Sequence, residues 1–413
     1  MNNNIKKPEL LLPAANLEVL KIAVIYGADA VYIGGDMYGL RAKAKNFSME
    51  EMKEGIAFAH SHGKRVYVTA NITAHNEDLE GIRKYVKELN AFGKDRPDAL
   101  IVADPGVFSI VSEEAPEIEI HISTQANNTN YETYRFWHKL GATRVVSARE
   151  LSMKEIAELR TKIPEEMEIE TFVHGAMCIA YSGRCLLSNY FTGKDANKGE
   201  CTHSCRWKYH LVEETRPGEY LPIEENDRGT YIFNSKDLCM VEYIPEIVQA
   251  GINSLKVEGR MKTALYVATV ARTYRKAIDD YFKDPAIYEA NKSSYMDEIK
   301  KGVHRQFTTG FFFGKPTHKD QIYDSNTYEK AYTYLGTISG EKDGMYRLEQ
   351  KNKFSVGETM EVIKPNGDTL EVVVKRIIDE EGNDMDSCPH PRQIIYVDFG
   401  IKLEQYDILR RKE

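Results

Sequence analysis

Short apolar runs that alternate with helical patterns constrain the fold of this 413-residue chain more than any other feature. Most of these runs are nearly continuous in apolar or β-branched residues, which is typical of parallel strands covered by helices on both faces. The eight candidate strands are Glu9–Pro13, Ala30–Gly34, Arg65–Ala70, Ala99–Ala103, Glu119–Thr124, Arg144–Ala148, Ile169–His174 and Ser254–Glu258. Eight strand–helix units predict an α/β fold, a TIM-type (β/α)8 barrel, in which the loops after the strands form the catalytic mouth. A doubly wound open sheet is the alternative, but no GxGxxG motif follows the first run.

The segments between the runs carry helix-start signals. Ser48 with Glu51, and Ser152 with Glu155, have the spacing of a capping box, in which each side chain bonds to the backbone of the other residue. Farther along the chain, Asp237–Ala250 is predicted to be a helix that leads into the eighth strand.

Residues 1–283 are predicted to form the barrel, including a long insertion. About eighty residues separate the seventh and eighth runs, far more than an ordinary loop contains, and we assign 175–253 to this insertion. Residues 284–330 have a helical pattern followed by aromatic residues, so we interpret them as a connecting segment. Residues 331–413 consist of short alternating runs with turn signals, such as PNGD at 365–368, which predict a small β-barrel or β-sandwich domain.

The composition is that of a soluble globular protein, with 42% hydrophobic and 29% charged residues. The N-terminal stretch has no apolar signal segment, and no later run reaches membrane-spanning length. We therefore expect a cytoplasmic protein with no membrane partner. A net charge of −8 argues against a general nucleic-acid coat protein, although a local basic surface is compatible with it.

The insertion opens with a loop rich in cysteine and glycine. Four of the six cysteines lie there, separated by six, fifteen and three residues: Cys178, Cys185, Cys201 and Cys205. The loop has too few apolar residues to bury a core, so thiolates that bind a metal ion or an iron–sulfur cluster are the sharpest explanation. The spacing matches neither zinc ribbons nor ferredoxins, and it leaves zinc, an iron–sulfur cluster and four unrelated buried thiols open. Cys239 and Cys388 lie outside the loop and are predicted to be core residues.

Three polar residues at strand ends are candidates for catalysis. His174 ends the seventh run and is expected to point toward the mouth, where it would act as a general acid or base or bind substrate. A hydrogen-bonded structural histidine is the alternative. In the sequence HISTQANN, His121 and Gln125 alternate inward with Ser123 at the end of the fifth run, which favours a ligand-facing role.

Cations follow the eighth run, in the sequence KVEGRMK. Lys256, Arg260 and Lys262 lie near the start of the next predicted helix, where helix-end amides add to the attraction for an anion. Many barrels bind phosphate after strands seven and eight, so we expect a carboxylate or phosphate ligand here, with solvated surface charges as the alternative. Arg41 and Asn71 follow the second and third runs and are also expected on the mouth side.

Motifs of common hydrolases are missing, because the sequence contains no HExxH, no GxSxG and no Walker-type GK[ST]. Several other stretches resemble peptidase family U32, the collagenase-like group of unassigned catalytic type. They are ETFVHGAMCIAYSGRCLLSNY, PELLLPAAN, AVYIGG, ISTQANN, NSKDL and LKVEGRMK. The resemblance covers residues 8–315 and, less specifically, the C-terminal domain.

Within this family, the length and the appended β domain are most similar to bacterial members that act in tRNA hydroxylation. The resemblance implies an RNA-modifying enzyme that converts the wobble uridine of tRNA to 5-hydroxyuridine with prephenate as co-substrate. It also implies a 4Fe-4S cluster on Cys178, Cys185, Cys201 and Cys205, supplied by the iron–sulfur assembly machinery. Other relatives act on ribosomal RNA or in oxygen-independent ubiquinone hydroxylation.

The family label makes a peptidase the second hypothesis. A peptidase needs a nucleophile with a base, or a metal with an open position, and four cysteines that close a coordination shell offer no such position. A non-catalytic binding or scaffold protein with structural zinc is the third hypothesis. We favour hydroxylation, and we expect the two carboxylates of prephenate to bind Arg260, Lys262 and Arg41.

Overall fold

The structure is a computed structural model of the chain. It describes residues 6–35, 38–39, 46–177, 185–198, 200–206, 224–226, 229–231, 235–316 and 328–413. No helix within these ranges is both long enough and apolar enough to cross a membrane.

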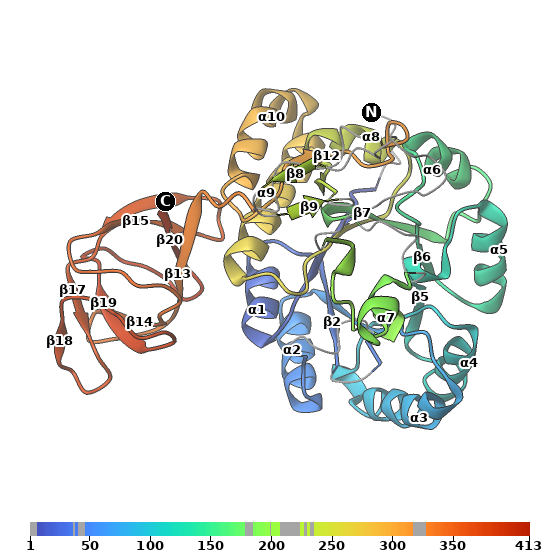
Figure 1. The fold of residues 1–413 in the computed structure, drawn as a ribbon, viewed down its shortest axis with the longest axis horizontal. Helices are drawn as coiled ribbons and strands as arrows, with labels where there is room; N and C mark the ends of the chain where they lie inside the picture. Colours follow the sequence, from blue (N-terminus) through green and yellow to red (C-terminus); the bar gives the residue numbers. More distant parts are fainter. Residues whose placement is uncertain are drawn as a thin grey trace.

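An eight-stranded parallel barrel forms the larger part of the molecule (Figure 1). Its strands are β1 (Glu9–Pro13), β2 (Ala30–Gly34), β3 (Arg65–Ala70), β4 (Ala99–Val102), β5 (Glu119–Ile122), β6 (Arg144–Val146), β7 (Glu168–Ala176) and β11 (Ser254–Val257). Strand β11 pairs in parallel with both β1 and β7, which closes the sheet. The predicted TIM-type barrel is therefore confirmed, with a strand at each of the eight predicted positions.

Helices follow the strands and cover the outside of the barrel (Figure 1). They are α1 (Leu17–Ile25), α2 (Met49–Ser61), α3 (Asn76–Asn90), α4 (Pro105–Glu114), α5 (Tyr131–Leu140), α6 (Met153–Arg160) and α9 (Ala264–Lys283). Their apolar faces and the outward faces of the strands form one core, in which Ile56, Val86 and Leu255 are fully buried. Both predicted capping boxes are present, at the starts of α2 and α6.

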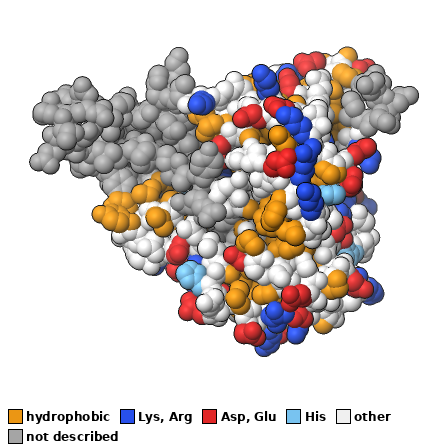
Figure 2. Space-filling model, turned by 90° about the vertical axis from the view of Figure 1, so that its right-hand side faces the viewer, with side chains coloured by type: hydrophobic (Ala, Val, Ile, Leu, Met, Phe, Trp, Pro, Cys, Tyr) orange, Lys and Arg blue, Asp and Glu red, His pale blue; other side chains and the backbone are white. Residues whose placement is uncertain are grey.

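Figure 2 shows the side of the barrel that lies at the right in Figure 1. Lys, Arg, Asp and Glu side chains are interspersed over this face, and hydrophobic side chains form a patch near its middle. On α5, Phe136 and Leu140 are 54% and 50% exposed. Phe136 packs against the buried ring of Trp137, with 5.2 Å between the ring centroids, so part of the Phe136 ring is covered by its neighbour on the same helix.

Among the described residues of the insertion between β7 and β11, the structure differs from the prediction in one element. The expected helix Asp237–Ala250 is wrong in its first part, because β10 (Asp237–Cys239) pairs antiparallel with β7 and parallel with β12 (Phe307–Thr308). Asp237 accepts hydrogen bonds from Nε and Nη2 of Arg305, at 3.1 and 2.9 Å, which ties the strand to a distant segment. The α-helices and other strands that the structure describes in the insertion are α7 (Leu187–Thr192), β8 (Glu224–Asn226), β9 (Gly229–Tyr231) and α8 (Ile244–Gln249). Helix α10 (Pro285–Ile299) follows α9, outside the insertion.

The C-terminal part is a separate antiparallel domain. Its strands are β13 (Tyr332–Lys342), β14 (Met345–Glu349), β15 (Thr359–Ile363), β16 (Thr369–Val373), β17 (Arg376–Ile378), β18 (Asp384–Met385), β19 (Ile394–Asp398) and β20 (Ile408–Lys412). They form one sheet in the order β16-β15-β20-β13-β14-β19-β17-β18, and the PNGD turn joins β15 to β16 as predicted. Leu335, Phe354 and Leu409 are fully buried in a core of its own, so the all-β domain is confirmed.

Hydrogen bonds join the two parts. Tyr26, which precedes β2 at the N-terminal end of the barrel, donates to the carbonyl of Ile363 at 2.8 Å. Arg272 of α9 donates to the carbonyl of Asp368 at 3.2 Å. The β domain is therefore attached away from the ends of the strands where barrel enzymes carry their chemistry.

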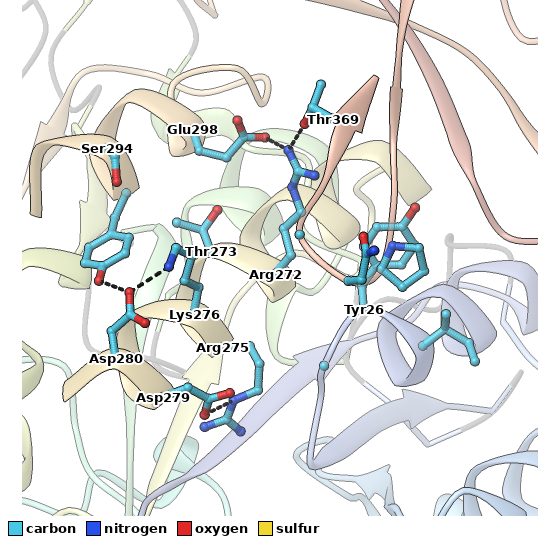
Figure 3. Close-up of a pocket in the computed structure, with 16 residues that line it drawn as sticks. Tyr26, Arg272, Thr273, Arg275, Lys276, Asp279, Asp280, Ser294, Glu298 and Thr369 are labelled. Carbon is cyan, nitrogen blue, oxygen red and sulfur yellow. Dashed lines mark hydrogen bonds and ion pairs between the residues drawn. The ribbon is translucent and has the colours of Figure 1, made fainter. Parts of the chain in front are cut away.

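A polar cavity of about 500 Å³ lies at this junction, between α9, α10 and the turn after β15 (Figure 3). Its charged side chains are paired: Arg275 Nε lies 2.9 Å from Asp279, and Lys276 Nζ lies 2.8 Å from Asp280. Tyr295 also donates to Asp280, at 2.7 Å. Because these charges balance one another at the wrong end of the barrel for catalysis, we place the candidate site at the mouth instead.

Candidate active site at the barrel mouth

Paired charges fill the N-terminal half of the barrel interior. Arg144 of β6 binds Glu9 and Glu168, each at 2.6 Å. Its Nη1 also lies 3.2 Å from Glu170 of β7. Glu170 in turn binds Lys256 of β11, whose Nζ is 2.6 Å away. We call Glu9, Arg144, Glu168, Glu170 and Lys256 the interior charge network.

The network keeps its two most buried carboxylates ionised. Burial alone would raise the pKa of Glu170, but Lys256 and Arg144 hold that pKa below its usual value. Burial also opposes ionisation of Glu9, and Arg144 again lowers its pKa overall. Buried charges that are paired and hydrogen-bonded in this way fix the geometry of the barrel rather than exchange protons with a substrate.

His121 lies beside this network rather than at the mouth. Its ring packs edge-on against Tyr67, with 4.6 Å between centroids, and its Nε2 lies 3.3 Å from Glu119. Its Nδ1 is buried with no hydrogen-bond partner among the described residues. Burial and the nearby Arg144 lower the pKa of His121, so the ring stays neutral near pH 7.

Above the network, hydroxyl and amide groups converge at the C-terminal ends of β3 and β5. Asn71 Nδ2 donates to Ser123 Oγ at 3.2 Å, and Ser123 Oγ donates to Gln125 Oε1 at 3.5 Å. After β11, Arg260 donates from Nη1 to the hydroxyl of Thr69 at 3.2 Å. We call Thr69, Asn71, Ser123, Gln125 and Arg260 the mouth cluster. The structure thus brings together three residues predicted separately: Asn71, Gln125 and Arg260.

Two glycines leave room for Arg260 and for its partner Thr69. A Cβ at Gly34, the last residue of β2, would overlap Nη1 of Arg260. A Cβ at Gly39 would lie 2.8 Å from Thr69 Oγ1, closer than real Cβ contacts. Small residues in the loop after β2 are therefore part of what positions this corner of the mouth cluster.

The cysteine-bearing segment is docked onto the same edge of the barrel. The backbone N–H of Thr73, two residues after Asn71, donates to the carbonyl of Asn197 at 3.1 Å. Asn197 Nδ2 donates to the carbonyl of Cys185 at 3.3 Å. Lys198 pairs with Glu77 of α3, with 3.3 Å between Nζ and Oε1. These contacts link the loop after β3 to the start of the cysteine-bearing segment.

The cysteines fall into two classes. Cys185 and Cys205 are partly exposed and Cys201 is exposed, whereas Cys239 and Cys388 are buried core residues, as predicted. Burial raises the pKa of the Cys239 thiol to about 12, which disfavours the thiolate. The Oγ of Ser188 contacts Cys201 Sγ at 3.9 Å and Ser204 Oγ, next to Cys205, at 3.5 Å.

Part of the predicted ligand set cannot be placed by these contacts, because Cys178 lies outside the described residues. Within the described ranges, no group of three or more His, Cys, Asp or Glu side chains is arranged to hold a metal ion. The structure therefore leaves the metal centre of the sequence analysis as a prediction.

His174 is buried beneath aromatic residues. Its Nδ1 lies 3.4 Å from the hydroxyl of Tyr274, and its ring is 6.0 Å from that of Tyr266 and 5.8 Å from that of Phe307. Burial lowers the pKa of His174 to about 3. His174 packs between β7, α9 and β12, with 2% of its surface exposed, and its lowered pKa favours the neutral ring at pH 7.

The predicted cations are not gathered at one point. Lys256 lies inside the barrel in the charge network, and Lys262 lies over the rings of Tyr266 and Tyr328. Arg41 lies outside the described residues. Of these cations, Arg260 is the one that the described contacts place in the mouth cluster.

An ion pair that lies near the strand ends was missed by the sequence analysis. Arg149, after β6, lies 3.2 Å from Glu258, after β11, and its guanidinium is 3.8 Å from the centroid of the Phe172 ring. Its position directly after the sixth predicted strand is the signal that could have found it, because such residues face the mouth.

Comparison with known proteins identifies the family. The family model described as peptidase family U32 matches residues 15–322, and the one described as peptidase family U32 C-terminal domain matches residues 330–410. The chain is 43% identical over 408 residues to tRNA hydroxylation protein P1 of Bacillus subtilis, which covers 98% of this chain and 95% of that protein. It is 38% identical over 452 residues to tRNA hydroxylation protein P of Escherichia coli, with 98% and 97% covered. It is 32% identical over 373 residues to the 23S rRNA 5-hydroxycytidine synthase of Escherichia coli, with 89% and 53% covered. The chain, in both its barrel and its β domain, belongs to peptidase family U32.

Proposed function

We propose that the chain is an RNA-modifying enzyme that hydroxylates tRNA, converting the wobble uridine to 5-hydroxyuridine. The observation that carries this proposal is the similarity over nearly the whole chain to two proteins named for tRNA hydroxylation, at 43% and 38% identity. A third relative is named for the synthesis of 5-hydroxycytidine in 23S rRNA. The chemistry shared by these names is hydroxylation in RNA.

A redox group is required by this chemistry. Replacing the hydrogen at position 5 of uracil by a hydroxyl group removes two electrons from the base. The reaction therefore needs a two-electron acceptor from outside the chain and a donor of the hydroxyl oxygen. A 4Fe-4S cluster, once delivered by the assembly machinery, would pass the electrons one at a time toward that acceptor. It would be held by Cys178, Cys185, Cys201 and Cys205.

The donor set supports this assignment. The three described thiols, on Cys185, Cys201 and Cys205, are accessible and lie in a segment that contacts the loop after β3. The two cysteines outside that segment are buried in apolar cores, where thiolate ligands are disfavoured. Zinc is the alternative occupant, since it also accepts four thiolates.

Prephenate is the proposed co-substrate, and it carries two carboxylates. Arg260 would bind one of them, because a guanidinium matches the geometry of a carboxylate and this one belongs to the mouth cluster. Asn71 and Gln125 would orient the substrates through their amide groups. His121 and His174 would act from buried, neutral positions, which suits positioning better than proton transfer at pH 7.

The mouth cluster gives little support to a peptidase. In that cluster, the hydroxyl of Ser123 interacts with the amides of Asn71 and Gln125 and not with a histidine. Activation of a serine requires a base within hydrogen-bond reach. We therefore keep hydroxylation as the proposed activity, ahead of proteolysis and of a scaffold with structural zinc.

The test is the nucleoside content of tRNA from cells that lack this chain. Cells are grown without oxygen, so that oxygen-dependent routes are excluded, and total tRNA is digested and analysed by liquid chromatography and mass spectrometry. We expect 5-hydroxyuridine and its derivatives to be lost, and to be restored by the wild-type chain but not by Cys201→Ser. Unchanged 5-hydroxyuridine in the cells that lack the chain would contradict the proposal.

A further inference from the structure

Ser188 carries a buried hydroxyl on a helix whose neighbouring side chains lie outside. It is 1% exposed, whereas Leu186, directly before α7, and Tyr190 are 69% and 81% exposed. Helix α7 therefore turns a serine inward instead of these large apolar side chains, which is the reverse of an ordinary surface helix. A buried hydroxyl costs free energy unless it is hydrogen-bonded, so the partners of Ser188 indicate what its position serves.

The hydrogen bonds of Ser188 Oγ leave its proton with two acceptors in reach. A hydroxyl has one proton to donate and two lone pairs with which to accept. Both lone pairs are used by Thr202, whose backbone N–H and Oγ1 donate to Ser188 Oγ at 3.0 and 3.1 Å. The proton of Ser188 can then be donated to Cys201 Sγ, at 3.9 Å, or to Ser204 Oγ, at 3.5 Å. The better acceptor of the two decides its direction.

The charge on a ligand sulfur favours Cys201 as the acceptor. A cysteine that binds a metal ion or an iron–sulfur cluster is a thiolate, and anionic acceptors form stronger hydrogen bonds than neutral hydroxyl groups do. The two hydrogen bonds from Thr202 polarise the hydroxyl of Ser188 and so strengthen its donation. When Cys201 is a ligand, we therefore expect Ser188 to donate to its sulfur.

The chain holds Ser188 in this position from two sides. On the helix, Thr192 Oγ1 donates to the carbonyl of Ser188 at 2.6 Å, and Gly193 ends α7 in the left-handed conformation, at a φ of 68°. On the other side, Thr202 binds the hydroxyl of Ser188 and directly follows Cys201 in the sequence. The hydroxyl and the sulfur are thus held together by their own neighbours, as is typical of groups that orient a metal ligand.

We infer that Ser188 is a positioning residue for the metal centre: its hydroxyl donates to the sulfur of Cys201 and raises the reduction potential of the bound cluster. This inference rests on the proposed function, because it concerns the cofactor proposed there. One-electron reduction adds a negative charge to the cluster. A hydrogen bond to one of its sulfurs stabilises the reduced state more than the oxidised state, and so raises the potential.

The test is the reduction potential of the protein purified without oxygen, titrated with dithionite and followed by electron paramagnetic resonance. We expect Ser188→Ala to lower the potential by about 59 mV, which corresponds to a tenfold change in the ratio of reduced to oxidised cluster. Ser188→Thr keeps the hydroxyl and should keep the wild-type potential. Thr192→Val is the matched control, because it removes a hydroxyl of the same helix that donates to a carbonyl and not to sulfur. Its potential should equal that of the wild type.

Iron and acid-labile sulfide are counted in each variant, so that a change of potential is separated from loss of the cluster. An unchanged potential in fully loaded Ser188→Ala overturns the inference. An equal fall in Thr192→Val also overturns it, because that fall would be an effect of helix packing. If Ser188→Ala takes up no iron, Ser188→Thr decides: a loaded centre with the wild-type potential supports the role of the hydroxyl, and an empty one overturns it.

The outcomes separate this inference from the proposed function. Zinc in place of iron in the wild type contradicts the proposed cofactor, and the same hydrogen bond is then tested by the rate at which a chelator removes zinc. Ser188→Ala should raise that rate about tenfold, and an unchanged rate overturns the inference. Unchanged 5-hydroxyuridine in cells that lack the chain contradicts the proposed function itself, whatever the potential of Ser188→Ala.

Discussion

Polar residues serve different purposes in the two halves of the barrel interior. In the interior charge network, Arg144 and Lys256 lie within 3.2 Å of carboxylates that hold their charge. In the mouth cluster, Arg260 donates to the hydroxyl of Thr69, and the amides of Asn71 and Gln125 interact with the hydroxyl of Ser123. The network lies on β1, β6, β7 and β11, whereas the mouth cluster lies at the C-terminal ends of β3, β5 and β11.

The difference separates stability from ligand binding. A buried charge that already has its counter-charge gains little from a ligand, and removing its partner is costly. Hydroxyl and amide groups can exchange partners at small cost, so the mouth cluster can bind substrates that come and go. Polar residues inside a barrel are thus not equivalent as site candidates: buried pairs of a carboxylate and a cation indicate a stabilising role, and hydroxyl and amide groups at the strand ends indicate ligand binding.

The largest expected effect is on stability, from removal of one charge of the network. Glu170→Ala leaves Lys256 and Arg144 short of a carboxylate in the barrel interior, and we expect the free energy of unfolding to fall by about 3–5 kcal/mol. The midpoint of urea unfolding measures this change. Glu132→Ala removes an exposed partner of Arg135 and should cost less than about 1 kcal/mol.

Equal losses in the two variants would break the distinction between the network and the surface. A stable Glu170→Ala protein would show that Lys256 and Arg144 are not held by this carboxylate.

The second effect is on the pH dependence of stability. Burial lowers the pKa of His174 to about 3 in the folded chain, whereas the usual pKa of histidine is about 6.5. At a pH between these two values, the unfolded chain therefore binds a proton that the folded chain does not. The free energy of unfolding therefore falls as pH falls, by up to about 1.4 kcal/mol per pH unit, or about 2 kcal/mol between pH 6.5 and 5. Above pH 6.5 this contribution is absent.

Urea unfolding between pH 5 and 8 tests this, because carboxylates with lowered pKa titrate below that window. His174→Gln should reduce the slope of the free energy of unfolding against pH, and the remaining slope should include the contribution of His121. Asn71→Ala at the mouth should leave this slope unchanged. A slope that His174→Gln leaves intact would mean that His174 is protonated in the folded state.

The third and smallest effect is on substrate binding. Arg260→Ala is expected to raise the KM for prephenate about tenfold, the size of one charge-assisted hydrogen bond to a carboxylate. Arg260→Lys keeps the charge but loses the guanidinium geometry, so its KM for prephenate should lie between those of the wild type and of Arg260→Ala. Steady-state hydroxylation of tRNA with varied prephenate measures both, and an unchanged KM would remove Arg260 from the site.

Much of the fold is readable in the sequence because the decisive signals are local. The boundaries of β1, β2 and β3 agree with the predicted apolar runs, and Ser48 with Glu51 forms the predicted capping box. The part that failed depends on distant partners. Asp237–Cys239 is a strand because it pairs with β7 and β12 and because Arg305 binds Asp237, none of which local spacing contains.

The location of the candidate site residues could be predicted in part for the same reason. Asn71, Gln125 and Arg260 follow strand ends, and strand ends meet at the mouth whatever their partners are. Lys256 was assigned to an anion site although it lies within β11 and faces Glu170. The alternation of Glu168 and Glu170 at inward positions of β7 was the missed signal, because two acidic residues inside a barrel require cations.

The most direct test of the account is the iron and acid-labile sulfide content of the protein purified without oxygen. We propose that the cysteines of the cysteine-bearing segment hold a redox cluster and that the buried Cys239 and Cys388 do not. We expect about four iron and four sulfide per chain, lost in Cys201→Ser and kept in Cys388→Ala. Zinc alone in the wild-type protein, with no iron recovered on reconstitution, would contradict the claim.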